Sequence, residues 1–188
     1  LNNGVLTLNN SIISGNSSSG TGGGVSSSDG ILTLHNSVIS GNSASGNGGG
    51  IYFFNGTLTL NNSSIMKNTS STGKGGGLYM LNGILTMRNS TIASNSSTDG
   101  GGIYSSNNTL TLTNDTIGDN SATGNGGGIF TNNSTITLDK STIFNNTTAS
   151  NGGGIFVNSA NSPTVIHDYP VVLERSIVAG NHSNQDLD

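Results

Sequence analysis

Reactive side chains are most concentrated between residues 158 and 175 of this chain. The stretch contains both prolines, His167 and Asp168, and ends with Glu174 and Arg175. A histidine and carboxylates held side by side could perform acid–base chemistry, such as hydrolysis or lyase cleavage of a polysaccharide. These four residues are the only catalytic candidates, and the favoured interpretation of the stretch is a surface loop or a packing flap.

Carboxylates elsewhere do not show a spacing that suits glycoside hydrolysis, which needs two of them about 5 to 9.5 Å apart. Asp99 has no acidic residue about 26 residues before or after it, and Asp115 aligns with Ser141 rather than with Asp139. We interpret these aspartates as solvated turn and surface positions, and we expect no catalytic residue.

Aromatic side chains recur once every 25 to 27 residues, and in a strand they would point to one side. Exposed aromatic strips commonly mark interaction surfaces, so this column could stack against sugar rings or against another chain. The alternative is that loops cover the rings or that they belong to the core. The members of the column are Tyr52, Tyr79, Tyr104, Phe130 and Phe156.

Composition excludes several other functions. Only 14 of the 188 residues carry charge (five basic and nine acidic), and the basic residues are scattered, so no nucleic-acid surface is expected. No apolar run approaches the ~20 residues of a membrane span. Three histidines without ligand spacing and no cysteine give no metal site and no cofactor site.

The chain is built from repeats, because several columns of residues advance in step. The aliphatic residue that follows each glycine triplet recurs at intervals of 25 to 27 residues, from Val25 to Ile155. An isoleucine or valine column runs from Ile13 to Val178 with the same rhythm. The column three residues later is invariant and comprises Asn16, Asn42, Asn68, Asn95, Asn120, Asn146 and Asn181. The period near 26 indicates a repeat protein.

Strands, not helices, fit this repeat. No apolar stripe has a period of 3.6 residues, whereas the recurring LTL phrase places both leucines on one face and the threonine on the other. Dipeptides such as Asn55-Gly56 are expected to make turns before these strands. Three short strands per repeat predict a parallel β-helix of about seven coils and roughly 34 Å in length, since rungs lie about 4.8 Å apart.

In such a coil, the stacked asparagines would pass amide hydrogen bonds from rung to rung. The glycine triplets would mark a corner where the backbone needs positive φ or where coils approach closely. A phosphate-binding loop is disfavoured, because no helix follows any triplet. The threonine column from Thr7 to Thr137 suggests ice binding, but its irregular and partly charged neighbours favour ordinary strand propensity instead.

The repeat resembles a known family. GGG with an aliphatic residue, then LTL, then phrases such as TIASN and TIFNN resemble the repeats of polymorphic outer-membrane proteins and of related bacterial right-handed β-helix surface proteins. The hallmarks of that family are GGA plus an aliphatic residue and FxxN; here they read GGG and IxxN, as in Ile117 to Asn120. The resemblance implies a right-handed helix in a secreted or surface-exposed structural or adhesive segment, often an autotransported passenger.

These observations predict one domain, residues 1–188, with an insertion at 158–170, and we expect it to be a piece of a longer chain. The expected function is a non-catalytic stalk, adhesin or extracellular filament subunit at a bacterial-type cell surface. The expected partners are a second copy of the chain, associating end to end or laterally, glycans, or a host or neighbouring cell surface. The alternative is a carbohydrate-active β-helix enzyme that uses residues 158–175, since polysaccharide lyases share this architecture.

Overall fold

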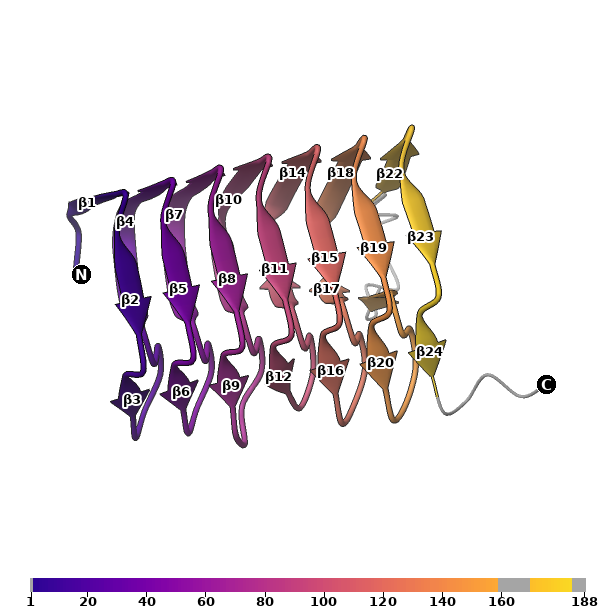
Figure 1. Ribbon diagram of the computed structural model, residues 1–188, viewed down its shortest axis with the longest axis horizontal. Helices are drawn as coiled ribbons and strands as arrows, with labels where there is room; N and C mark the ends of the chain where they lie inside the picture. The colour runs from indigo at the N-terminus through magenta and orange to yellow at the C-terminus, as the bar shows by residue number, and fades with distance from the viewer. Residues whose placement is uncertain (1, 159–169, 184–188) are drawn as a thin grey trace, which may run out of the picture.

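The computed structural model describes residues 2–158 and 170–183. These residues form a parallel β-helix, which is built from strands and contains no α-helix. Successive coils stack along one axis, so that β2 and β23 lie at opposite ends of the rod (Figure 1). The predicted architecture of three strands per coil is confirmed. The second sheet has seven rungs, which six complete turns connect, close to the seven coils expected.

Three sheets run along the rod, and all of their strand pairs are parallel. The first sheet contains β1 (Val5–Asn9), β4 (Val25–His35), β7 (Ile51–Asn61), β10 (Leu78–Arg88), β13 (Ile103–Ser106), β14 (Thr109–Thr113), β17 (Ile129–Asn132), β18 (Thr135–Asp139), β21 (Ile155–Asn158) and β22 (Val171–Glu174). The second contains β2 (Ile12–Ser14), β5 (Val38–Ser40), β8 (Ser64–Met66), β11 (Thr91–Ala93), β15 (Thr116–Gly118), β19 (Thr142–Phe144) and β23 (Ile177–Ala179). The third contains β3 (Ser17–Ser18), β6 (Ser43–Ala44), β9 (Thr69–Ser70), β12 (Ser96–Ser97), β16 (Ser121–Ala122), β20 (Thr147–Thr148) and β24 (His182–Ser183).

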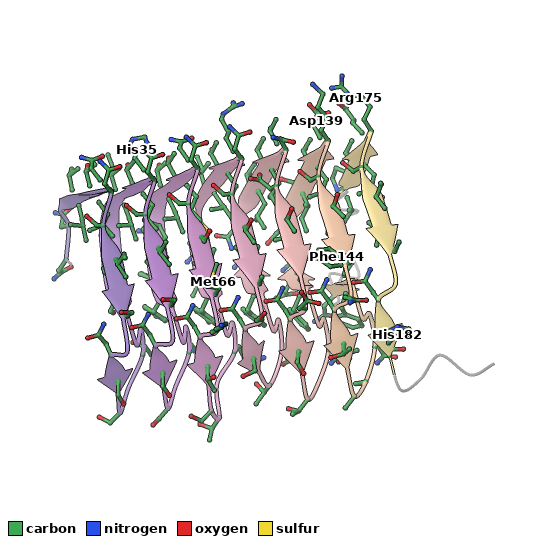
Figure 2. All side chains as sticks on the ribbon, in the orientation of Figure 1. His35, Met66, Asp139, Phe144, Arg175 and His182 are labelled. Atoms are coloured by element: carbon green, nitrogen blue, oxygen red, sulfur yellow. The ribbon has the colours of Figure 1, made fainter. Side chains whose placement is uncertain are left out.

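The core is a narrow column of aliphatic side chains from the first two sheets. Leu58, Leu60 and Ile65 have no exposed surface, and the equivalent residues of the other interior coils are buried in the same way. Side chains that point outward cover the ribbon in regular rows along the rod (Figure 2). Strand alternation therefore sorts each LTL phrase as the sequence predicted, with leucine inside and threonine outside.

Asn-Gly dipeptides bend a continuous strand, which differs from the turns that we expected. In β7, Asn55 and Gly56 have φ values of 62° and 128°, and the strand continues through both residues. In later coils the same side is divided, so that β13 and β14 are separate strands on either side of Asn107 and Asn108. Close packing explains why the continuous strands carry glycine here, because a Cβ atom on Gly56 would lie 2.1 Å from the carbonyl oxygen of Gly30, whereas the first divided coil carries Asn108 at this place.

The glycine triplet serves both purposes that the sequence suggested. Gly48, the first glycine of its triplet, has a φ of +72°. A Cβ atom on Gly49 would lie 2.4 Å from the carbonyl carbon of Thr69, and a Cβ atom on Gly50 would lie 2.6 Å from the Gly77 carbonyl oxygen. The first glycine of a triplet thus supplies a left-handed corner, and the other two allow the coils to approach each other.

A buried asparagine column holds the coils in register beside this corner. The Asn68 side chain has no exposed surface, and its Oδ1 accepts hydrogen bonds from the backbone N–H and the Nδ2 of Asn42, at 2.9 and 3.0 Å. Its own Nδ2 donates to the Ile39 carbonyl and to Asn95 Oδ1. The same bonds connect all seven asparagines from Asn16 to Asn181.

Candidate functional site

The aromatic column stands on the outer surface of the first sheet, one residue after the buried aliphatic of each coil. Neighbouring rings are stacked with their centroids 5.3 Å apart for Tyr52 and Tyr79, 5.1 Å for Tyr79 and Tyr104, and 4.8 Å for Tyr104 and Phe130. Phe130 and Phe156 lie 5.3 Å apart with a tilt of 32°. Because each ring covers the face of its neighbour, the column presents ring edges to the outside.

Access to this column differs along the rod. Tyr52 and Tyr79 are half-buried, whereas Tyr104 and Phe130 are only 9% and 5% exposed although neither belongs to the hydrophobic core. The sequence suggested one outward strip of five rings. The rings do point outward, but the two in the middle are covered, so the half-buried members are Tyr52 and Tyr79 at one end of the strip and Phe156 at the other.

Lys74 covers the middle of the column. Its Nζ atom lies 4.8 Å from the ring centroid of Tyr104 and 5.7 Å from that of Phe130, and it forms an ion pair with Asp99 at 3.2 Å. Burial lowers the pKa of Lys74, but Tyr104 and Asp99 outweigh this effect and raise it above the ordinary value. The cation therefore stays charged over the rings, an arrangement that cation–π attraction favours.

The residue before each glycine triplet forms a second outward column next to the rings. Asn47 Oδ1 accepts a hydrogen bond from the Lys74 backbone N–H at 2.9 Å, and Asp99 Oδ1 accepts one from the Asn125 N–H at 2.8 Å. Amides, one ion pair and aromatic ring edges thus share one surface. We call the aromatic column and this neighbouring column the aromatic–amide face; its members are Tyr52, Tyr79, Tyr104, Phe130, Phe156, Asn47, Lys74, Asp99, Asn125 and Asn151.

The Tyr79 phenol adds no charge to this face at neutral pH. Burial raises the pKa of Tyr79 above its usual value, and the adjacent Tyr104 and Tyr52 raise it further, against the opposing effect of Lys74. The Tyr79 phenol consequently acts as a neutral hydrogen-bonding group.

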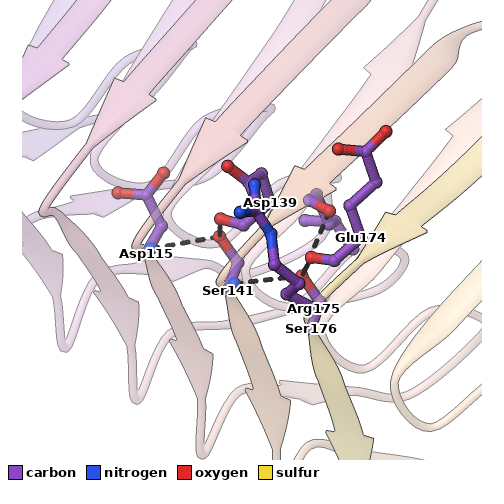
Figure 3. A network of polar contacts seen from close by, with 7 residues as sticks. Asp115, Asp139, Ser141, Glu174, Arg175 and Ser176 are labelled. Atoms are coloured by element: carbon purple, nitrogen blue, oxygen red, sulfur yellow. Dashed lines mark hydrogen bonds and ion pairs between the residues drawn. The ribbon is translucent and has the colours of Figure 1, made fainter.

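The catalytic candidates of the 158–175 stretch fall into two sets. His167 and Asp168 lie outside the described residues, whereas Glu174 and Arg175 are described and exposed. Arg175 donates from Nε and Nη2 to Asp139 Oδ1, at 3.0 and 2.6 Å, as Figure 3 shows. This surface ion pair leaves one oxygen of Asp139 bound by a guanidinium.

The sequence analysis did not recognise one pair of carboxylates that lies on adjacent rungs. Asp139 and Glu174 are register partners on β18 and β22, but the insertion separates them by 35 residues instead of 26. The signal was available, because Leu138 and Leu173 belong to one leucine column and the acids follow them directly. The two acids project from the outer surface of the sheet, where Arg175 pairs with Asp139 (Figure 3).

Asp115 was interpreted as a solvated position, and this interpretation is wrong. Asp115 is 2% exposed and occupies the place that serine holds in neighbouring coils. Its Oδ1 and Oδ2 accept hydrogen bonds from the backbone N–H groups of Ser90 and Thr113, at 2.7 and 2.8 Å. Burial raises its pKa to about 6 despite these bonds.

The column that contains Asp115 is a second hydrogen-bonded ladder, which sequence reasoning missed. Each hydroxyl accepts a hydrogen bond from the backbone N–H one coil earlier and donates to the carbonyl two residues before it. Figure 3 shows its C-terminal part, from Asp115 through Ser141 to Ser176. The signal was a residue two positions before each member of the isoleucine or valine column, and the ladder comprises Ser11, Ser37, Ser63, Ser90, Asp115, Ser141 and Ser176.

A shallow hollow of about 310 Å³ lies where the first sheet divides, next to Gly83 and Asn108. Two hydrogen bonds hold the Asn108 side chain in place. Its Oδ1 accepts one from the Gly83 N–H at 2.6 Å, and its Nδ2 donates one to the Met80 carbonyl at 2.9 Å. Glycine, amides and threonines line the hollow, and none of these groups provides an acid or a base.

Within residues 2–158 and 170–183, no three histidines, cysteines or acidic residues lie close enough together to hold a metal ion. In the same residues, no helix has the length and apolar character needed to cross a membrane.

Comparison with known proteins supports the fold and the type of repeat. Residues 1–143 match the family model described as right handed beta helix region, and residues 140–158 match the Chlamydia polymorphic membrane protein repeat. Comparisons with curated proteins and with solved structures returned no match. The first match agrees with the predicted right-handed coil, and the second indicates a repeat of the kind found in surface proteins.

Proposed function

Because the chain belongs to the right-handed β-helix family, we propose that it is a non-catalytic, adhesive stalk segment of a secreted or cell-surface protein. The observation that carries the proposal is the unbroken hydrogen bonding between coils. The asparagine and serine columns continue from the first coil to the last, which makes the segment a stiff rod whose outward columns can vary. The polymorphic membrane protein repeat supports the surface location.

The aromatic–amide face is the part of this rod that we propose contacts a partner. It combines ring edges, amides and an ion pair, which suit a polar surface rich in hydroxyl groups. Two of its half-buried rings, Tyr52 and Tyr79, lie next to each other on β7 and β10, which are among the longest strands. Glycans on a neighbouring cell are the partner with this chemistry, since sugars offer both apolar ring faces and hydroxyls.

Adhesion under flow tests the proposal directly. Microspheres coated with the purified chain are expected to stay on mucin-coated glass, and the double variant Tyr52→Ser and Tyr79→Ser is expected to release them at lower shear. The matched control is Thr59→Ser and Thr86→Ser, which changes two outward residues of the same strands away from the face. Equal retention of the wild-type chain and of uncoated microspheres would contradict the proposal.

Glycan cleavage is the second candidate function, and the acids Asp139 and Glu174 on adjacent rungs are the observation that favours it. Two carboxylates on neighbouring coils are close enough in principle for glycoside hydrolysis. The pairing of Asp139 with Arg175 weakens the case, because the bound carboxylate is a poorer base. Release of reducing ends from a polysaccharide panel, abolished by Glu174→Gln, would establish the enzyme.

Self-association is a third form of the proposal. The inward-facing Leu173 and Val178 of the last coil are 51% and 42% exposed, and the inward-facing Leu8 and Ile13 of the first coil are half-buried. A further coil or a second copy of the chain would cover such residues equally well. Electron microscopy over a concentration series distinguishes the two, because only a second copy produces fibres that lengthen with concentration.

A further inference from the structure

The outer surface of the first sheet changes abruptly between β4 and β7. At consecutive rungs, Ser26 pairs in register with Tyr52, and Ser28 pairs with Phe54. All four side chains point outward, since Val25, Ser27, Ile51 and Phe53 between them are buried. Two small side chains therefore lie directly beside two large aromatic ones.

This change of size forms a ledge, which we name the Tyr52 ledge and define by Ser26, Ser28, Asp29, Tyr52, Phe54 and Asn55. Tyr52 stacks against Tyr79 on one side, while on the other side the rung carries serine instead of a ring. The ring column thus stops at Tyr52, and the ring face toward Ser26 has no aromatic neighbour among the described residues.

The dimensions of the ledge suit one flat ring. Rungs lie about 4.8 Å apart, and the stacked rings that follow Tyr52 are separated by 5.3 and 5.1 Å. A six-membered ring seated over Ser26 would therefore continue the column by one position, as the side chains of the next three coils do.

The polar groups of the ledge determine which ring fits. Ser28 provides a hydroxyl on the floor, and Asp29 and Asn55 are exposed at its end, where Asn55 Nδ2 donates to Asp29 Oδ1 at 2.7 Å. An aromatic side chain of a partner would form no hydrogen bond with the Ser28 hydroxyl or the Asp29 carboxylate, whereas sugar hydroxyls can bond to both. The carboxylate of Asp29 opposes an anionic sugar.

We propose that the Tyr52 ledge binds a single neutral pyranose unit of a glycan, with the apolar face of the sugar on Tyr52 and its hydroxyls toward Ser28 and Asp29. This inference rests on the proposed adhesive function, and it narrows the contact from the whole aromatic–amide face to one sugar subsite. The covered rings Tyr104 and Phe130 take no part.

Filling the ledge is the sharpest test. The double variant Ser26→Tyr and Ser28→Phe repeats the pair of residues found one coil later, so the fold accepts it. Gly22 next to Ser26 has the same left-handed φ, 65°, as Gly48 next to Tyr52, at 72°. The matched control is Ser64→Tyr, an outward, half-buried serine on the second sheet. Asp29→Asn is a milder variant, because asparagine occupies this left-handed position in the next three coils.

The probes are the methyl glycosides of glucose, galactose and N-acetylglucosamine, with methyl sialoside as the anionic comparison. Nuclear magnetic resonance titration is expected to show saturable shifts of Tyr52 with at least one neutral sugar and weaker binding of the sialoside. The filled variant should lose affinity by about tenfold or more, equivalent to about 1.4 kcal/mol, and Asp29→Asn should lose several-fold. Ser64→Tyr should bind like the wild-type chain.

The proposed sugar site would be refuted if the filled variant bound as well as the wild-type chain, or if none of the neutral sugars gave saturable binding. Adhesion measured in parallel separates the two proposals. A chain that holds microspheres to mucin but loses nothing when the ledge is filled adheres through another surface. A chain that binds a neutral sugar at Tyr52 yet holds no microspheres retains the subsite and refutes the adhesive function.

Discussion

The asparagine column and the serine column run along the same rod, and both connect every coil to the next. The asparagine column is uniform in all seven coils, whereas the serine column accepts an aspartate at position 115. The difference lies in what each place demands. An asparagine such as Asn95 must accept two hydrogen bonds and donate two, and no other side chain of that size does so.

The serine position demands less. Its oxygen accepts one bond from the previous coil and its hydroxyl donates to a carbonyl in the same turn. A carboxylate can perform the first task, and Asp115 does so for the Ser90 N–H. The comparison shows that hydrogen-bond valence, more than burial, restricts which residue a buried column tolerates.

Breaking the asparagine column should have the largest effect. Asn95→Ala leaves the buried N–H of Asn68 and the carbonyl of Ile65 without their partner. We expect a loss of about 3 kcal/mol in the free energy of unfolding, since each unsatisfied buried group costs roughly 1–3 kcal/mol. Urea denaturation measures it, with the exposed Asn9→Ala as a control that should change little. Equal stability of the two variants would show that the column is not essential.

Restoring serine at position 115 should stabilise the protein at neutral pH. The folded-state pKa of Asp115 is about 6, against an ordinary value of 3.8, so ionisation costs the folded state more than the unfolded state. That penalty is absent below the ordinary pKa, grows as pH rises between the two values, and is complete above pH 6. We expect Asp115→Ser to gain about 1–2 kcal/mol at neutral pH.

The pH dependence of the stability penalty that ionised Asp115 causes is the diagnostic measurement. Thermal unfolding of the wild-type chain and of Asp115→Asn should differ little at pH 4 and most at pH 7, because only the wild-type residue ionises between them. A difference that stayed constant across this window would place the effect in packing and not in the carboxylate charge.

Removing one ordinary serine should cost less than removing an asparagine. Ser63→Ala takes the acceptor from the buried Ser37 N–H, at 3.1 Å, and the donor from the Asn61 carbonyl. We expect about 1–2 kcal/mol of destabilisation, measured by the same denaturation. A cost as large as that of Asn95→Ala would remove the distinction between the two columns.

The smallest effect is expected at the outward column. Lys74→Met removes a partly exposed ion pair and a cation–π contact but keeps an unbranched side chain at this position. Such contacts contribute roughly 0.5–1 kcal/mol at exposed sites. The loss should shrink in high salt, and a salt-independent loss would assign it to packing of the side chain.

Much of the fold could be predicted because strand alternation and stacking repeat a local rule. Leu58, Leu60 and Asn68 each fall on a column that the sequence displays, and the structure buries all three. The bend at Asn55-Gly56 was predicted as a turn, because a dipeptide that favours positive φ does not reveal whether the strand continues through it. The serine ladder was equally visible in the sequence and was overlooked.

The candidate site was less predictable for a physical reason. That Tyr104 points outward followed from alternation, but its burial depends on the long side chain of Lys74, which reaches over the ring from the preceding coil. The pairing of Asp139 with Glu174 and Arg175 depends on how the chain returns to register after the insertion.

The sequence by itself determined the period, the inward and outward columns and the places where only glycine or asparagine fits, because these follow from neighbouring residues and a fixed rung spacing. Tertiary structure alone decided which outward groups stay accessible and why Asp115 is desolvated. Those properties arise from contacts between coils, because the length of one side chain and the size of its neighbour determine the solvent exposure of both.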